Sequence, residues 1–234
     1  MTNKAAIPSS FSDPKIVSEY AEKTARLVPG LSDLHRMTGI LLAEKAPANG
    51  RILVIGAGGG LELKAFAETH PEWRFDGVDP SAEMIQLAKT TLGALSSRVD
   101  FYESYIDGVP EGPFDAAACL LTLHFLENDE RFRTVNEIFR RLKPGAPFVV
   151  AHHSFPNKDS DKDKWLALFA AFAAASGVPF SQAENSINAM KERLPVLSPS
   201  EDETILRESG FTNIDLFYAA FTFKGWVCYK PDNV

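Results

Sequence analysis

The sequence predicts an α/β fold built around a mostly parallel sheet, and the order of its segments carries this prediction. Short apolar runs typical of buried strands alternate with segments whose apolar residues recur at helical spacing. This alternation is typical of crossover connections between parallel strands. The chain has 234 residues, of which 45% are hydrophobic, enough to bury a full core in one domain. We therefore expect residues 1–234 to form a single domain.

Two helices are expected ahead of the first strand, over residues 12–28 and 31–46. The first begins with Ser12, Asp13 and Pro14, residue types that favour a helix start. We expect these helices, within residues 1–48, to form a lid over the domain. The central elements follow in the order strand 51–55, helix 59–69, strand 73–78, helix 81–95, strand 98–102, strand 114–119, helix 129–142 and strand 146–152.

After the fifth strand the composition changes, and we expect a helical insertion over residues 156–195. A charged run leads into an Ala- and Phe-rich helix, and a polar helix follows near residues 181–193. Trp165, Phe169 and Phe172 form an apolar stripe on the first of these helices, suited to core packing or to a dimer contact, with a wall of the substrate pocket as a further alternative. A helix over 200–209 precedes two final strands, which we expect to pair antiparallel around Lys224 and Gly225.

The segment RILVIGAGGG raises the question of what a buried strand gains from a turn almost without side chains. Glycine permits positive φ and a close approach by another molecule. Gly56, Gly58 and Gly60 have the G-x-G-x-G spacing of S-adenosylmethionine sites, whereas the third glycine of a dinucleotide site would fall on Leu61. Asp79, at the end of the second strand, is placed to accept hydrogen bonds from ribose hydroxyls. The glycine spacing and Asp79 together predict a site for S-adenosylmethionine and disfavour an NAD-linked oxidoreductase.

Charge and composition exclude other classes of function. The formal net charge of -7 disfavours a nucleic-acid substrate. The first ten residues lack the apolar core of a signal peptide, and no apolar run reaches the length of a membrane span. We expect a cytoplasmic protein. Cys119 and Cys228 lie in apolar stretches without metal-ligand spacing, so we expect buried thiols and no metal site.

Several motifs together resemble class I S-adenosylmethionine-dependent methyltransferases. They follow one another over about residues 50–230 as ILVIGAGGG, GVDPSAEMI, FDAAACLLTLHFLE, RRLKPGAPFVV and LRESGF. The resemblance implies a Rossmann-like, seven-stranded sheet whose last strand is antiparallel. Over nearly the whole length, the chain is also similar to the carboxy-S-adenosylmethionine synthase family of tRNA wobble-uridine modification. That likeness rests on VPGLSDLHRMTGILLAE, LLTLHFLE, FSQAENSINAM and the C-terminal segment.

The resemblance also implies which residues contact S-adenosylmethionine. The loop of Gly56, Ala57 and Gly58 would cradle its methionine portion. Asp79 and Pro80 would hold the ribose, and Tyr105 and Ile106 would border the adenine. Further contacts would come from Gly60, Met84 and Leu120.

Some positions depart from the family pattern. Val54 and Tyr105 stand where the family usually has acids, and Leu120 stands where the synthase has asparagine. By this alignment, the synthase arginine that holds an extra carboxylate falls on Glu184, and a second carboxylate there would repel it. The synthase activity is therefore not favoured unless Lys191 or Arg193 replaces the arginine.

The leading hypothesis is methyl transfer from S-adenosylmethionine to a small-molecule acceptor. His124, His152 and His153 are the candidates for proton transfer or acceptor contact, with plain structural packing as the alternative for each. Phe11 and Tyr20 are candidates for an aromatic lid, and the aromatic C-terminal strands allow a homodimer. A synthase-like enzyme and a non-catalytic S-adenosylmethionine-binding protein remain as alternatives.

Overall fold

The computed structural model describes residues 19–232, in which a seven-stranded sheet has the order β3-β2-β1-β4-β5-β7-β6. The first five strands run parallel, and β7 lies antiparallel between β5 and β6. The prediction of a seven-stranded sheet with an antiparallel last strand is therefore confirmed. The strands are β1 (Arg51–Ile55), β2 (Arg74–Asp79), β3 (Val99–Glu103), β4 (Ala116–Leu120), β5 (Pro147–His153), β6 (Thr212–Ala220) and β7 (Phe223–Tyr229).

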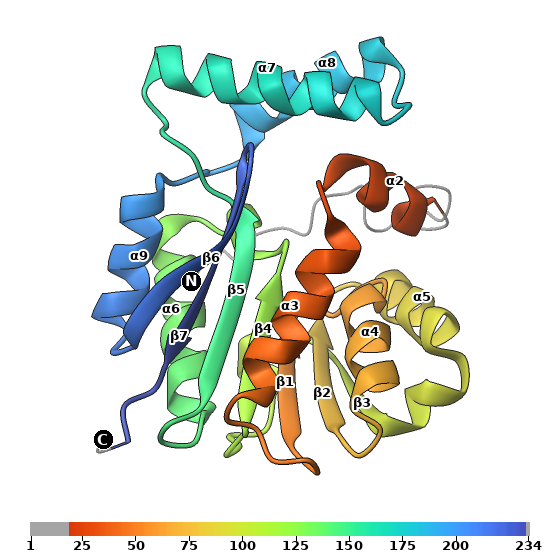
Figure 1. Cartoon of the computed structure of the whole chain (residues 1–234), viewed down its shortest axis with the longest axis vertical. Helices are drawn as coiled ribbons and strands as arrows, with labels where there is room; N and C mark the ends of the chain where they lie inside the picture. Colours follow the sequence, from red (N-terminus) through yellow and green to blue (C-terminus); the bar gives the residue numbers. More distant parts are fainter. Residues whose placement is uncertain (1–18, 233–234) are drawn as a thin grey trace.

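Helices cover both faces of this sheet and also lie beyond the carboxyl ends of its parallel strands (Figure 1). Packed on one face are α3 (Leu31–Ala43), α4 (Leu61–Thr69) and α5 (Ala82–Leu92); on the other are α6 (Asn128–Arg141) and α9 (Pro199–Glu208). Beyond the carboxyl ends of the parallel strands lie α2 (Tyr20–Leu27), α7 (Asp159–Ala175) and α8 (Phe180–Arg193). Short 3-10 helices are η2 (Gly93–Arg98), η3 (Ile106–Gly108) and η4 (Leu123–Phe125).

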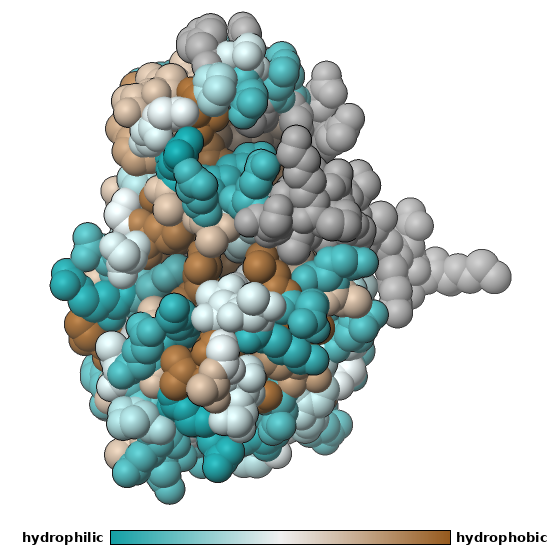
Figure 2. Space-filling model, turned by 90° about the vertical axis from the view of Figure 1, so that its right-hand side faces the viewer, coloured by the Kyte–Doolittle hydropathy of each residue, from teal (hydrophilic) through white to brown (hydrophobic). Residues whose placement is uncertain are grey.

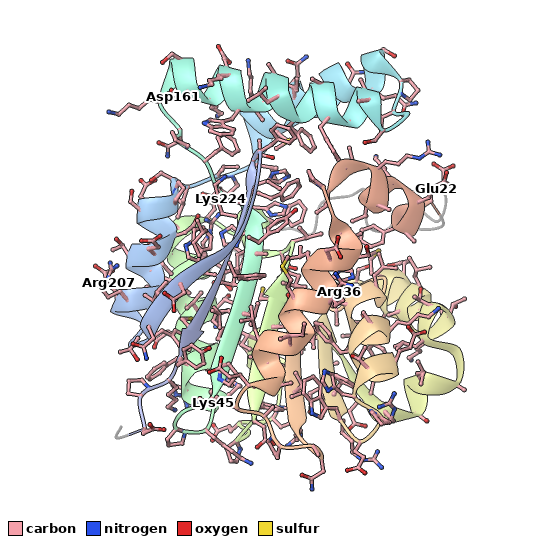
Figure 3. The ribbon with its side chains drawn as sticks, in the orientation of Figure 1. Glu22, Arg36, Lys45, Asp161, Arg207 and Lys224 are labelled. Atoms are coloured by element: carbon pink, nitrogen blue, oxygen red, sulfur yellow. The ribbon has the colours of Figure 1, made fainter. Side chains whose placement is uncertain are left out.

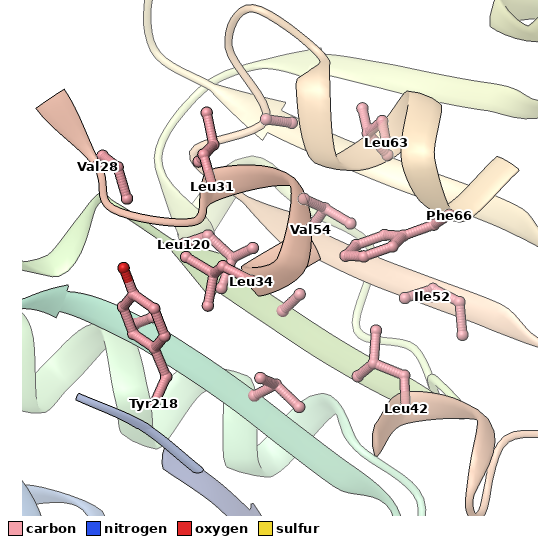
Figure 4. Packing of buried hydrophobic residues seen from close by; sticks show 14 of the residues in the cluster. Val28, Leu31, Leu34, Leu42, Ile52, Val54, Leu63, Phe66, Leu120 and Tyr218 are labelled. Atoms are coloured by element: carbon pink, nitrogen blue, oxygen red, sulfur yellow. The ribbon is translucent and has the colours of Figure 1, made fainter. Parts of the chain in front are cut away.

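The central strands β1, β4 and β5 are buried almost throughout and largely apolar, because helices cover both faces of the sheet there. In β1, Ile52 and Val54 point into the core beneath α3 and α4, whereas Leu53 and Ile55 point into the core beneath α6. Figure 4 shows Val54 near Phe66 of α4. Cys119 and Cys228 are buried free thiols, as the sequence predicts.

The turn between the last two strands differs from its predicted position. Residues 221–222 form the turn, so Lys224 and Gly225 belong to β7 rather than to the loop. Phe221 takes a positive φ of 49°, and the carbonyl of buried Thr222 accepts a hydrogen bond of 2.8 Å from the Ser154 amide. Gly225 instead permits close strand packing, because a Cβ there would lie 3.1 Å from the Ala151 side chain.

The apolar stripe of α7 packs against this hairpin. Phe169 is buried, and its ring meets Phe223 edge-on at 6.0 Å between centroids. The ring of Phe172 lies 5.8 Å from that of Phe221, and the Trp165 ring lies 5.2 Å from the Lys224 ammonium. Core packing, one of the predicted uses of the stripe, accounts for these contacts.

The outer surface carries most of the charged residues (Figures 2 and 3). Arg36 and Lys45 extend outward from the region of α3, and Arg207 from α9. Among residues 19–232, no helix combines the length and the apolar character needed to cross a membrane.

A buried ion pair joins α6 to α9. Arg131 Nη1 lies 2.8 Å from Asp202 Oδ1, with side-chain exposures of 1% and 3%. Arg131 also donates a hydrogen bond of 2.8 Å to the Pro195 carbonyl, which fixes the segment that leads into α9. Removal of one partner from such a pair leaves the other charge buried and unbalanced.

We predict that Arg131→Met lowers the free energy of unfolding by about 3–5 kcal/mol, because the Asp202 carboxylate loses its cation. Urea denaturation followed by circular dichroism measures the change. The control is Arg36→Met, whose ion pair with Asp33 is exposed and should contribute less than about 1 kcal/mol. Equal small losses in both variants would contradict the role given to the buried pair.

Candidate functional site

A pocket opens at the carboxyl edge of β1, β2 and β4, where ligands bind in open α/β sheets. It contains about 1050 Å³ of empty space, part of which is open to solvent. Its walls come from α2, α3, the start of α4, the ends of these strands, and the loops that follow β3 and β4.

The glycine turn forms the floor of the pocket. Gly56 and Gly58 carry no side chains there, and a Cβ at either position would collide with neighbouring atoms. Gly56 has a φ of 75°, and a Cβ on it would overlap the side chain of Thr122. A Cβ on Gly58 would lie 2.5 Å from Asp79 Oδ2 and 2.8 Å from the Met84 Cβ. The missing side chains therefore let the β1–α4 turn lie directly against the end of β2.

Asp79 joins this turn to the start of α5. One carboxylate oxygen accepts a hydrogen bond of 3.0 Å from the Gly58 amide, and the other accepts one of 2.9 Å from the Ser81 amide. Burial nevertheless raises the pKa of Asp79 to about 6, against the effect of these two amides. The carboxylate is thus held in a fixed orientation at the pocket wall, as ribose recognition requires.

The structure brings most of the predicted nucleotide contacts together. The predicted residues that line the pocket are Gly56, Gly58, Asp79, Pro80, Met84, Tyr105, Ile106 and Leu120. Ala57 and Gly60 do not line it. The Ala57 amide donates to the Val78 carbonyl at 3.0 Å, and Gly60 packs so closely on Ala88 that a Cβ would lie 2.9 Å from its Cα. These two residues shape the turn from behind.

The three predicted histidine candidates are absent from the pocket lining. His152 points to the opposite face of the sheet, where its Nε2 lies 3.1 Å from Asp202 Oδ1. His124 Nδ1 accepts a long hydrogen bond of 3.4 Å from the His153 amide, and His153 Nδ1 lies 2.9 Å from Thr222 Oγ1. Burial lowers the pKa of His124, and that of His153 to about 3. These contacts agree with the packing alternative.

Two titratable residues of the pocket were not singled out from the sequence. Glu62 of α4 is 6% exposed, and burial raises its pKa to about 8 with a further contribution from Asp79. His35 of α3 is also buried, which lowers its pKa to about 4. In the sequence, Glu62 resembles an ordinary acid in the first turn of a helix. Its helical position alone gave no sign that it lines the pocket.

The remaining walls are largely apolar and carry no basic charge. Leu31, Leu61, Leu121, Phe125 and Leu126 line the pocket, and no lysine or arginine lines it among the residues that the structure describes. Tyr20 and Thr24 close one side from α2. Phe11, the other predicted lid residue, lies outside the described residues.

The positions proposed to distinguish the synthase are less completely described. The helix α8 contains position 184, but the side chains of Glu184 and Arg193 lie outside the described residues. Lys191 Nζ forms an ion pair of 2.5 Å with Asp163, so its charge is already engaged. No described side chain of α8 lines the pocket.

Comparison with known proteins agrees with this site. A family model described as a methyltransferase domain matches residues 52–145, which include the glycine turn and Asp79. By its fold and this match, the chain resembles class I S-adenosylmethionine-dependent methyltransferases. It is 22% identical over 218 residues to a carboxy-S-adenosyl-L-methionine synthase of Campylobacter lari, with 93% of each chain covered.

Two further similarities concern longer proteins. The chain is 29% identical over 217 residues to lovastatin diketide synthase of Monascus pilosus, with 87% of this chain but 8% of that protein covered. An O-methyltransferase family protein from Burkholderia thailandensis has a TM-score of 0.71 at 15% identity. That comparison covers 97% of this chain and 63% of the solved one, so this chain spans less than two thirds of it.

The raised pKa of Glu62 predicts how stability depends on pH. Folded Glu62 retains a proton that the unfolded chain releases near its ordinary pKa of 4.5, so folding loses stability as pH rises through about 8. Between pH 7 and pH 9 we expect wild type to lose about 1 kcal/mol more than Glu62→Gln. Urea denaturation of both proteins at the two pH values measures this difference, and parallel pH profiles would contradict it.

Proposed function

We propose that this protein transfers a methyl group from S-adenosylmethionine to a small, largely apolar acceptor that carries no negative charge. The observation that carries this proposal is the pocket itself, where the glycine turn and Asp79 meet an apolar wall without lysine or arginine among its described residues. An anionic acceptor would lack a cationic partner in that wall. The negative net charge of the chain likewise disfavours nucleic acid.

The residues present fit S-adenosylmethionine. The turn at Gly56 and Gly58 provides a cradle that a Cβ would fill, and Asp79 offers fixed oxygens to the ribose hydroxyls. Pro80, Tyr105 and Ile106 lie beside Asp79 and would flank the adenine. At a position where the resembled family usually has an acid, the ring of Tyr105 can contact the adenine.

S-adenosylmethionine, when bound, supplies an electrophilic methyl group on a sulfonium. The protein's contribution is to orient the acceptor and to exclude water from the reacting atoms. Leu31 and Phe125 provide apolar surface for the acceptor, and α2 covers the pocket through Tyr20 and Thr24. His35 is a weak base because of its low pKa, so proton removal by this histidine is not part of the proposal.

The carboxy-S-adenosylmethionine synthase alternative has support from the names of several relatives. Its extra carboxylate would require a cation near the methyl position. The described pocket residues do not supply one, and Lys191 is paired with Asp163. We therefore favour plain methyl transfer and keep the synthase as the second candidate.

Other features stay predictions. The proposal includes a single domain, a lid formed by residues 1–48, an insertion over residues 156–195, and a cytoplasmic location. A homodimer is compatible with exposed Leu216 on the edge strand β6. Light scattering of the purified protein measures its oligomeric state.

The first test is calorimetric titration of the purified protein with S-adenosylmethionine. We expect binding to the wild type and an affinity at least roughly tenfold lower for Asp79→Ala, because the ribose hydroxyls lose an anionic acceptor. Glu103→Gln, an exposed acid at the end of the neighbouring strand β3, is the matched control. Absence of binding to wild type would contradict the proposed function.

Mass spectrometry of co-purified nucleotide then separates the two enzymatic candidates. S-adenosylmethionine or its demethylated product supports methyl transfer, and acceptors are sought by incubating panels of uncharged small molecules with methyl-labelled cosubstrate. A nucleotide heavier by one carboxylate group would favour the synthase. Tight binding without turnover of any acceptor would favour a binding protein.

A further inference from the structure

We infer that the carboxylate of Glu62 binds the ammonium group in the amino-acid portion of S-adenosylmethionine, an inference that rests on the function proposed above. Glu62 is the second residue of α4, which begins directly after the glycine turn. Its side chain lines the pocket and is 6% exposed. A buried carboxylate is costly unless a partner compensates its charge.

The position of Glu62 is not explained by helix capping. Glu83 occupies the corresponding place in the first turn of α5, and its side chain is exposed. The favourable interaction of an acid with a helix N-terminus does not require burial. Glu62 is instead turned toward the pocket, which indicates a partner there.

Among the described residues, the groups that interact electrostatically with Glu62 supply no positive charge. They are Asp79 of β2, Tyr20 of α2 and Cys119 of β4. His35 of α3 also lines the pocket but is neutral near pH 7, because burial lowers its pKa to about 4. In the part of the chain that the structure describes, no cation lines the pocket beside Glu62, so a cation that displaces its proton would come from the ligand.

The layout of the pocket assigns this cation to one end of the ligand. Under the proposed function, the ribose lies at Asp79. Ile106 reaches the pocket from the sheet face covered by α6. Glu62 reaches it from α4, on the opposite face. A nucleoside whose adenine lies beside Ile106 directs its amino-acid portion across the glycine turn toward Glu62. Val54 of β1 is buried in the core and offers no competing charge.

Three nucleosides separate the possible roles of Glu62. S-adenosylmethionine carries a sulfonium and an ammonium, S-adenosylhomocysteine carries only the ammonium, and methylthioadenosine carries neither. For Glu62→Gln we expect calorimetry to show roughly tenfold or greater loss of affinity for the first two, because a charge-assisted contact is removed. Affinity for methylthioadenosine should stay within about twofold. Glu68→Gln, an exposed acid on the same helix, should change none of the three.

Proton release gives a second readout that simple damage to the fold would not imitate. In the free protein Glu62 retains a proton near neutral pH because its pKa is about 8, and a bound ammonium would displace it. Calorimetry at pH 7 in buffers of different ionisation enthalpy should show up to about one proton released by wild type and less by Glu62→Gln.

Several results would overturn the inference. Unchanged affinity of Glu62→Gln for all three nucleosides would exclude a charge partner, and a loss confined to S-adenosylmethionine would assign Glu62 to the sulfonium. Equal losses for all three would indicate damage to the pocket. Failure of wild type to bind any nucleoside would overturn the proposed function as well, which distinguishes it from a failure limited to Glu62.

Discussion

The close approach of the glycine turn to the end of β2 is the constraint on which the site depends. The Gly58 amide reaches Asp79 only because no Cβ stands between them. The same contact orients the carboxylate, while Ser81 holds its other oxygen and begins α5. A backbone feature of the parallel sheet thus produces both the shape of the pocket and its recognition of a ribose.

The electrostatic character of the pocket follows from what surrounds this turn. Asp79 and Glu62 share a space with apolar walls, and burial raises the pKa of each. A folded protein retains such groups at the expense of stability. Under the proposed function, a cationic nucleoside would compensate this cost when it binds.

The far side of the sheet supports the site without entering it. Arg131, Asp202 and His152 form a buried polar cluster that connects α6, α9 and β5. His153 and Thr222 connect β5 to the final turn. These contacts hold β5 to its neighbours, and the side chains of His152 and His153 do not line the pocket.

The sequence alone predicted the α/β order, the antiparallel last strand and most of the residues that the structure gathers around one pocket, because strand periodicity and the spacing of Gly56, Gly58 and Asp79 are local. The tertiary structure decided that Glu62 lines this pocket and that the three histidines do not. Whether a helix-start acid faces solvent or a ligand depends on what packs against it, and sequence spacing does not report this. The final turn moved to residues 221–222 for the same reason, since contacts of Thr222 with β5 and the segment after it outweigh the local preference of Gly225.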